Sequence, residues 1–74
     1  MPSDPPRTVR VRLNDRPAEL PAGQSLAGLL AARGLHPRTV MIEVNEQVVR
    51  RDDYSTVCPQ EGDRIEIVRM IAGG

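Results

Sequence analysis

Residues 61–74 read EGDRIEIVRMIAGG, and this closing stretch decides how the chain is expected to fold. Gly62 supplies the unusual backbone angles of a turn. Ile65 and Ile67 then alternate with two charged residues, which is the period-two pattern of a strand with one buried face. We therefore expect a strand over residues 64–70 that runs almost to the end of the sequence.

A similar alternation lies at the opposite end of the sequence, where residues 8–13 read TVRVRL. Its three apolar residues would share the buried face of a first strand. Asn14 and Asp15 tolerate turn geometry, so residues 16–20 are expected to return as the second strand of a hairpin. Pro17 suits an edge strand, because proline has no backbone N–H to donate.

One short helix is expected after the hairpin, opening with AGQSLAGLL at residues 22–30. Ser25 is a sound N-cap, because its hydroxyl can accept a hydrogen bond from a free amide of the first turn. The leucines that follow recur at spacings of three and four residues, as on the buried side of an amphipathic helix. Gly34 stands where a left-handed residue would end the helix. A helix this short must pack on a sheet to be stable.

Two further strands are expected between the helix and the closing strand. Residues 39–45 (TVMIEVN) are rich in β-branched side chains, and residues 47–50 follow after a turn. The first and last strands both begin after long connections, which leaves them free to pair at the centre of one sheet. This order predicts an α+β domain of the β-grasp type, a small mixed sheet packed on one main helix.

The 74 residues correspond to one domain or less. Three of the first six residues are proline, so residues 1–7 are interpreted as a flexible lead-in. Residues 8–70 would form the β-grasp domain. Residues 71–74 would form a flexible tail that ends in Gly-Gly.

The composition excludes several classes of function. Ten arginines balance ten acidic residues, so the formal net charge is zero and the basic surface of a nucleic-acid-binding protein is not expected. Tyr54 is the only aromatic residue, which leaves no platform for base stacking. The apolar runs are far shorter than a membrane span, and no signal peptide opens the sequence. We therefore expect a cytoplasmic protein with no membrane contact.

No catalytic or metal-binding group of residues is evident. Cys58 and His36 together cannot supply the ligands of a structural zinc site. Asp52 and Asp53 are interpreted as caps of the turn before Tyr54, because no second cluster of ligands accompanies them. We expect no enzymatic activity, no metal and no stably bound cofactor in this chain.

The end of the sequence is where chemistry is expected. Glycine has no Cβ, so Gly73 and Gly74 can pass through a narrow channel. The α-carboxylate of Gly74 is the least hindered acyl group that a chain can present. Residues 71–74 reach about 13–14 Å when extended, enough to carry that carboxylate into another protein's active site. An acyl group delivered in this way can be activated by adenylation, a reaction that this chain cannot perform itself.

The order of these motifs resembles the ThiS family of sulfur-carrier proteins, which are β-grasp relatives of MoaD and of ubiquitin. The resemblance covers nearly all of residues 8–74. It is carried by AGQSLAGLL, by VMIEVNEQVV at residues 40–49 and by EGDRIEIVRMIAGG. The last of these, a Gly-Asp turn before an alternating strand and a diglycine end, is the most specific.

This resemblance implies a carrier on which partner enzymes act. An E1-like adenylyltransferase of the ThiF type would use ATP to convert Gly74 to an acyl-adenylate. Sulfur that originates from cysteine through a desulfurase would then give a C-terminal thiocarboxylate, and thiazole synthase, ThiG, would accept it for the thiazole ring of thiamin. Gly74 would be the covalent site and Gly73 the clearance residue, with Ala72 and Ile71 as the rest of the threading tail.

Three other functions remain open from the sequence. A MoaD-like carrier uses the same chemistry for molybdopterin or another sulfur-containing metabolite, although Met70, Ile71 and Ala72, in place of a proline before the diglycine, favour ThiS. A non-covalent ubiquitin-like adaptor would not need its terminal glycines. A modifier of target lysines would form conjugates of high mass.

Val68 and Met70 are candidates for docking a partner. They have the opposite parity from Ile65 and Ile67, so they are expected to face away from the helix. Apolar side chains on that face, next to the tail, predict a docking patch, and Met41 would extend it if the strands are neighbours. The alternative is a set of scattered surface hydrophobes.

Other polar residues have weaker claims to a function. Four arginines on the expected strands are candidates for steering acidic partners: Arg10, Arg12, Arg64 and Arg69. Most charges on outward strand faces serve only to solvate the surface. Cys58 beside Pro59 is interpreted as structural and not as a carrier of sulfur.

Overall fold

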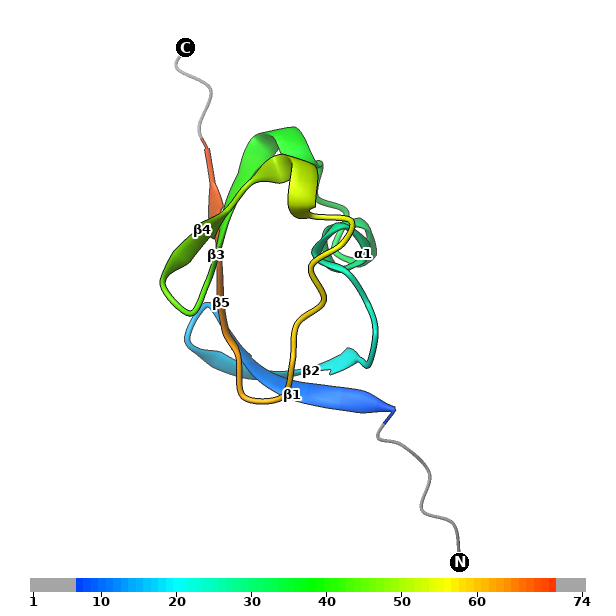
Figure 1. Cartoon of the computed structure of the whole chain (residues 1–74). Coiled ribbons are helices and arrows are strands. Elements are labelled where there is room, and N and C mark those ends of the chain that lie inside the picture. Colours follow the sequence, from blue (N-terminus) through cyan, green and yellow to red (C-terminus); the bar gives the residue numbers. More distant parts are fainter. Residues whose placement is uncertain (1–6, 71–74) are drawn as a thin grey trace, which may run out of the picture.

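The computed structural model describes residues 7–70, which form a five-stranded sheet that curves around one helix (Figure 1). The strands are β1 (Thr8–Leu13), β2 (Arg16–Pro21), β3 (Val40–Val44), β4 (Gln47–Val49) and β5 (Arg64–Arg69). The helix is α1 (Leu26–Ala32). Two short 3-10 turns lie in the connections, η1 (Pro37–Thr39) and η2 (Arg51–Asp53).

The strand order is β2-β1-β5-β3-β4, so the first and last strands lie side by side near the centre, as predicted. These two strands run parallel, and the other neighbouring pairs are antiparallel. With α1 packed on one face of this mixed sheet, the predicted β-grasp fold is confirmed.

The core lies between α1 and the concave face of the sheet. The leucine stripe of the helix supplies Leu26, Leu29 and Leu30, each at most 2% exposed. Ile42 of β3 and Ile65 of β5 are fully buried beneath them. No polar or charged side chain among residues 7–70 is buried. The folded state therefore depends on apolar burial, at about 1.5–3 kcal/mol for each large side chain.

The start of α1 is held by the segment that follows η2. Ser25 caps the helix as predicted, because its Oγ accepts a hydrogen bond from the Gly28 amide at 3.1 Å. The two amides before Gly28 donate to the carbonyls of Val57 and Tyr54, at 2.9 and 2.8 Å. The free amides of the first turn thus find partners, and the crossover segment is tied to the helix.

The interpretation of Asp52 and Asp53 as caps is wrong for their side chains. Arg50 occupies the N-cap position of η2, and no side chain forms a capping hydrogen bond there. The backbone carbonyl of Asp53 organises the turn instead, accepting hydrogen bonds from the amides of Thr56 and Val57 at 3.1 and 3.0 Å.

The end of α1 follows the prediction. Gly34 has a φ of 69°, in the left-handed region that favours glycine. Its amide donates to the Ala31 carbonyl at 3.1 Å, and the Leu35 amide donates to the Leu30 carbonyl at 2.9 Å. These bonds satisfy carbonyls of the last turn, and the Leu35 side chain packs back on the core.

Four strands, β2 to β5, have ends that differ by one residue from the sequence prediction. Thr39 belongs to η1 and not to β3, because its amide and hydroxyl both donate to the His36 carbonyl, at 2.9 and 2.8 Å. Arg50 and Met70 lie just beyond the ends of β4 and β5. At the other end of the chain, the carbonyl of Arg7 accepts a hydrogen bond from the Ala22 amide at 2.9 Å.

The edge strand β2 is protected by proline. The Arg12 amide donates to the Asp63 carbonyl at 2.9 Å, so the backbone of Arg12 faces away from β2. Its partner Pro17 therefore points its own nitrogen towards the free edge, and Pro21 has the same parity. Neither residue can donate a hydrogen bond, which makes this edge a poor template for an added strand.

The strand β5 is enclosed where it begins and open where it ends. It pairs with β1 only at Arg64 and Ile65, because β1 turns away at Asn14. The Asn14 side chain then accepts from the Ile67 amide at 2.8 Å and donates to the Ile67 carbonyl at 3.3 Å. On its other side, β5 is paired with β3 from Ile65 to Arg69. The second half of β5 is thus flanked by a strand on one side only.

Candidate functional site

The predicted covalent site, Gly74, lies outside the described residues, as do Gly73, Ala72 and Ile71 of the tail. The structure does describe the point from which the tail continues. The Met70 amide donates to the Thr39 carbonyl at 2.9 Å, just beyond the end of β5. The chain therefore reaches residue 70 on a backbone that is hydrogen-bonded to the folded body.

Val68 and Met70 are 43% and 46% exposed. Val68 lies on the sheet face that turns away from the helix, as its parity predicts, whereas Met70 follows the end of β5 and lines a hollow beside Leu35 and His36. Met41 lies directly opposite Val68 on the neighbouring strand β3, so the expected extension of the patch is present. Val48, which is 62% exposed, lies on the same face because it pairs with Glu43 of β3. We call these four apolar residues the outer patch.

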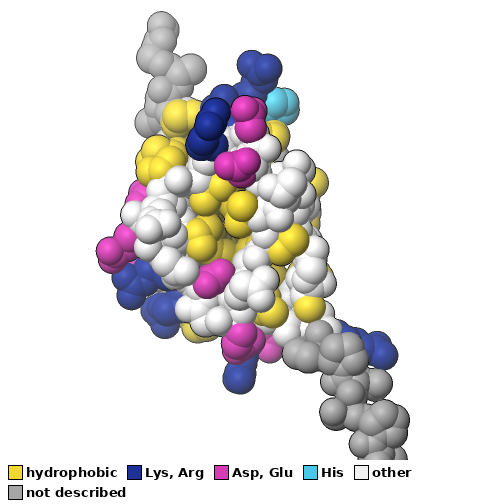
Figure 2. Space-filling view, in the orientation of Figure 1, with side chains coloured by type: hydrophobic (Ala, Val, Ile, Leu, Met, Phe, Trp, Pro, Cys, Tyr) yellow, Lys and Arg dark blue, Asp and Glu magenta, His cyan; other side chains and the backbone are white. Residues whose placement is uncertain are grey.

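Figure 2 shows hydrophobic side chains gathered on the side of the molecule formed by β3, β4 and the end of β5. Val48 was missed from the sequence, because two adjacent valines in a strand of three residues do not reveal which one faces outward. The pairing of β4 with β3 shows which valine faces outward: Val48 lies opposite Glu43, and Val49 is more buried than Val48. The outer patch therefore combines residues from three strands.

Two carboxylates interrupt the outer patch. Glu43 and Glu66 lie directly opposite each other on β3 and β5, and both are half-buried. No ion pair joins either of them to another described residue. Like charges in this position repel each other, so a cation brought by a partner would be attracted to this place.

The four arginines proposed for steering have different surroundings. Arg10 forms an ion pair with Glu61 at 3.4 Å, and Arg64 with Glu46 at 3.8 Å. Arg12 donates to the backbone carbonyl of Asp15. Arg69 alone of the four has no such bond among residues 7–70, and it adjoins the start of the tail.

Cys58 and His36 have local structural contacts. The Cys58 thiol lies 3.5 Å from the Gly23 carbonyl, beside the loop that leads into α1. The Nδ1 atom of His36 accepts from the Arg38 amide at 3.1 Å and so caps η1. Within the described ranges, no three potential ligand side chains gather as a metal site would require. No helix there is long and apolar enough to cross a membrane.

Comparison with known proteins gives consistent matches. The sequence model of the ThiS family matches residues 11–74. A thiazole synthase of Magnetococcus marinus is 42% identical over 66 residues, which are 89% of this chain and 20% of that protein. The sulfur carrier protein ThiS of Escherichia coli is 29% identical over 66 residues, which are 89% of this chain and all of that protein (100%).

A solved structure shares the fold. The crystal structure of the thiamine biosynthesis protein (ThiS) from Geobacter metallireducens matches with a TM-score of 0.74 at 22% identity. The match covers 89% of this chain and 100% of that one. The chain therefore spans the whole of two small relatives, but about a fifth (20%) of the thiazole synthases that it matches.

Proposed function

Because this chain belongs to the ThiS family, we propose that it is a sulfur carrier for the formation of the thiazole ring of thiamin. The observation that carries the proposal is the family match from residue 11 through Gly74, which includes the folded body and the diglycine end together. The similar proteins support it, since they are a ThiS sulfur carrier and thiazole synthases.

The proposed chemistry takes place on the α-carboxylate of Gly74. A carboxylate is a poor electrophile at neutral pH, so it must first be activated. Its oxygen would attack the α-phosphorus of ATP, which would give an acyl-adenylate and release pyrophosphate. The terminal sulfur of a persulfide on the desulfurase or on the activating enzyme would then attack the acyl carbon, forming a C–S bond as the C–O bond to AMP breaks. A thiol reductant would cleave the S–S bond of the resulting acyl disulfide. The thiocarboxylate that results holds sulfur where a docked enzyme can position it.

In this proposal the chain is a co-substrate and its partners are the catalysts. An E1-like adenylyltransferase of the ThiF type supplies the ATP chemistry, and a cysteine desulfurase supplies the sulfur. Thiazole synthase of the ThiG type receives the sulfur. All of them would act in the cytoplasm, and ATP would be bound by the activating enzyme and not by the carrier.

Gly73, Ala72 and Ile71 would thread the carboxylate of Gly74 into each active site. The outer patch would hold the folded body in place outside, with Val68 and Met70 nearest to the tail. A matching partner surface would be apolar and would bring a cation to Glu43 and Glu66. Docking at a place separate from the reacting group lets the body select the enzyme that receives the sulfur.

Intact-mass spectrometry tests the covalent step. The chain is incubated with ATP, the adenylyltransferase, the desulfurase, cysteine and a thiol reductant that releases the thiocarboxylate from the acyl disulfide. Exchange of the terminal oxygen for sulfur should add about 16 Da, as expected for nucleophilic acyl substitution. A chain that lacks Gly73 and Gly74 is the matched control and should keep its mass. Unchanged mass of the full chain, with enzymes that load another carrier, would contradict the proposal.

A further inference from the structure

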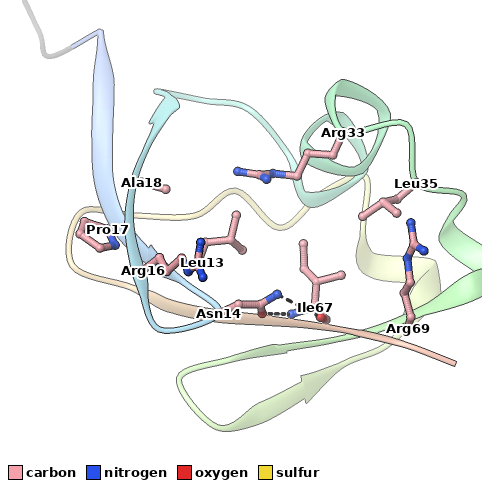
Figure 3. A pocket seen from close by; sticks show the side chains of 9 residues that line it. All are labelled: Leu13, Asn14, Arg16, Pro17, Ala18, Arg33, Leu35, Ile67 and Arg69. Atoms are coloured by element: carbon pink, nitrogen blue, oxygen red, sulfur yellow. Dashed lines mark hydrogen bonds between the residues drawn. The ribbon is translucent and has the colours of Figure 1, made fainter.

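A cleft of about 830 Å³ opens on the helix-covered face of the sheet, between the β1–β2 hairpin, the end of α1 and the end of β5 (Figure 3). Its place follows from the lengths of the elements. Seven helical residues span about 10 Å, whereas the six residues of β5 span about 20 Å. The helix therefore leaves the end of β5 uncovered, and β1 has already turned away at Asn14.

The walls of the cleft are basic. Arg16 of β2, Arg33 at the end of α1 and Arg69 of β5 line it, and no acidic residue does. None of the three forms an ion pair with another residue in the range 7–70, although Arg10, Arg50 and Arg64 do. In Figure 3, Arg33 extends across the cleft from the helix towards the hairpin, and Arg69 rises from β5 towards Leu35.

Part of this charge has a structural explanation. A cation at the C-terminal end of a helix is favoured by the helix dipole, and Arg33 is the C-cap of α1. That explanation does not extend to Arg16 or Arg69, which come from strands. The formal net charge of the whole chain is zero, so three unneutralised guanidinium groups around one hollow are a local excess that attracts anions.

The floor of the cleft is apolar and fixed. Leu13, Ala18, Leu35 and Ile67 line the cleft together with the arginines. Asn14 holds the backbone of Ile67 with its two hydrogen bonds. A small inorganic anion would leave this floor uncovered, so the ligand chemistry that fits is a carboxylate group next to an apolar side chain.

The free edge of β2 borders the same cleft at Pro17. Because Pro17 and Pro21 cannot donate hydrogen bonds at this edge, a peptide would not be held as an added strand. Recognition would depend on side chains, with arginine forks binding carboxylates and the floor receiving an apolar group.

We propose that this arginine cleft, lined by Arg16, Arg33 and Arg69, binds an acidic segment of thiazole synthase in which carboxylates flank an apolar side chain. The inference rests on the proposed function, because thiazole synthase is a partner only of a sulfur carrier. The place of the cleft supports it, since Arg69 precedes Met70 and an occupant would lie beside the start of the tail. The matching relatives support this choice of partner, because they are thiazole synthases about five times as long as the matched segment.

The cleft and the outer patch would lie on opposite sides of the end of β5. An enzyme that contacts both would hold the strand from two faces and leave the tail directed into its active site. Arginine–carboxylate pairs at an exposed site also accelerate association, and their contribution decreases as salt screens them.

The test compares two triple variants of equal net charge. Arg16→Gln, Arg33→Gln and Arg69→Gln remove the cleft charges, and Arg7→Gln, Arg10→Gln and Arg50→Gln remove three exposed charges elsewhere. Affinity for thiazole synthase is measured by titration calorimetry at low and at high NaCl concentration. We expect the cleft variant to bind about tenfold more weakly at low salt and to lose most of its salt dependence. The control variant should stay within about twofold of the native chain.

Three results would overturn the proposal. Equal binding by the cleft variant and the native chain would show that the cleft is not used. Equal weakening in both variants would show general charge attraction without a site. Weakened loading by the adenylyltransferase, with normal binding to thiazole synthase, would assign the cleft to the other enzyme.

Two further measurements distinguish these outcomes from misfolding of a variant and from failure of the proposed sulfur-carrier function. Far-UV circular dichroism and thermal unfolding check that both variants are folded. The gain of about 16 Da on loading checks the proposed function independently, because the acyl substitution takes place on Gly74 and not in the cleft.

Discussion

The two halves of β5 have different surroundings. In the first half, Ile65 is paired with β1 and with β3, and its side chain is fully buried. In the second half, β3 continues on one side, while Asn14 provides the connection on the other. Val68 is 43% exposed there. One strand thus buries a side chain in the core at its beginning and exposes an apolar side chain at its end. Mutations in the two halves should therefore separate effects on stability from effects on the proposed partner binding.

The largest effect on stability is expected from Ile65→Ala. Truncation of a large buried aliphatic side chain costs about 2–5 kcal/mol, because the cavity closes only in part. A domain of this size has a total stability of about 4–11 kcal/mol at 0.05–0.15 kcal/mol per residue. Urea unfolding should therefore show a large fall in the midpoint. Val68→Ala, three residues further along the same strand and on its opposite face, should cost less than about 1 kcal/mol.

A similar cost for both substitutions would contradict the contrast between the two halves. It would mean that Val68 contributes to the core as Ile65 does.

Weaker partner binding with little loss of stability is expected from Val68→Asp. A charge in the middle of an apolar contact should weaken binding of the adenylyltransferase or thiazole synthase by about tenfold or more. Thermal unfolding should be nearly unchanged, because the side chain is exposed in the free chain. Val48→Asp, further from the tail on β4, is a graded comparison and should weaken binding less. A variant at Val68 that fails to fold would place this side chain in the core and remove the argument for docking.

A loss of stability smaller than that of Ile65→Ala is expected from Asn14→Gly, because Asn14 joins the hairpin to the open half of β5. Asn14→Gly keeps the left-handed backbone, with φ of 50° in the native chain, but removes both hydrogen bonds to Ile67. The loss should be about 1–2 kcal/mol. Asn14→Ala should cost more, because alanine also resists the left-handed conformation by about 1–2 kcal/mol. Chemical unfolding of the two variants separates these contributions. An undisturbed Asn14→Gly variant would show that the bridge to Ile67 does not stabilise the fold.

Much of the fold could be predicted because it depends on short local sequence patterns. The alternation around Ile65 and Ile67 gave the closing strand, and Ser25 and Gly34 marked the ends of the helix. Pro17 was expected at an edge, and β2 is an edge strand. Each of these features depends on a few neighbouring residues, so no knowledge of tertiary structure was needed.

Features that depend on register could not be predicted in the same way. The exposure of Val48 follows from its pairing with Glu43. The arginine cleft exists because β1 pairs with β5 at two positions only and then turns away. Arg16, Arg33 and Arg69 lie on three separate elements, and no spacing in the sequence connects them. The repulsion expected between Glu43 and Glu66 likewise appears only once β3 and β5 are aligned.

The most direct test of the account follows the sulfur from the carrier to its product. The chain is loaded with isotopically labelled sulfur, freed of its activating enzymes and incubated with thiazole synthase and the remaining ring precursors, with no other sulfur source. We predict that the label appears in the thiazole product, with at most one labelled ring formed per carrier, and that the carrier returns to its unloaded mass. If the label stays on the protein while thiazole synthase is active with another loaded carrier, the chain is not the sulfur donor proposed here.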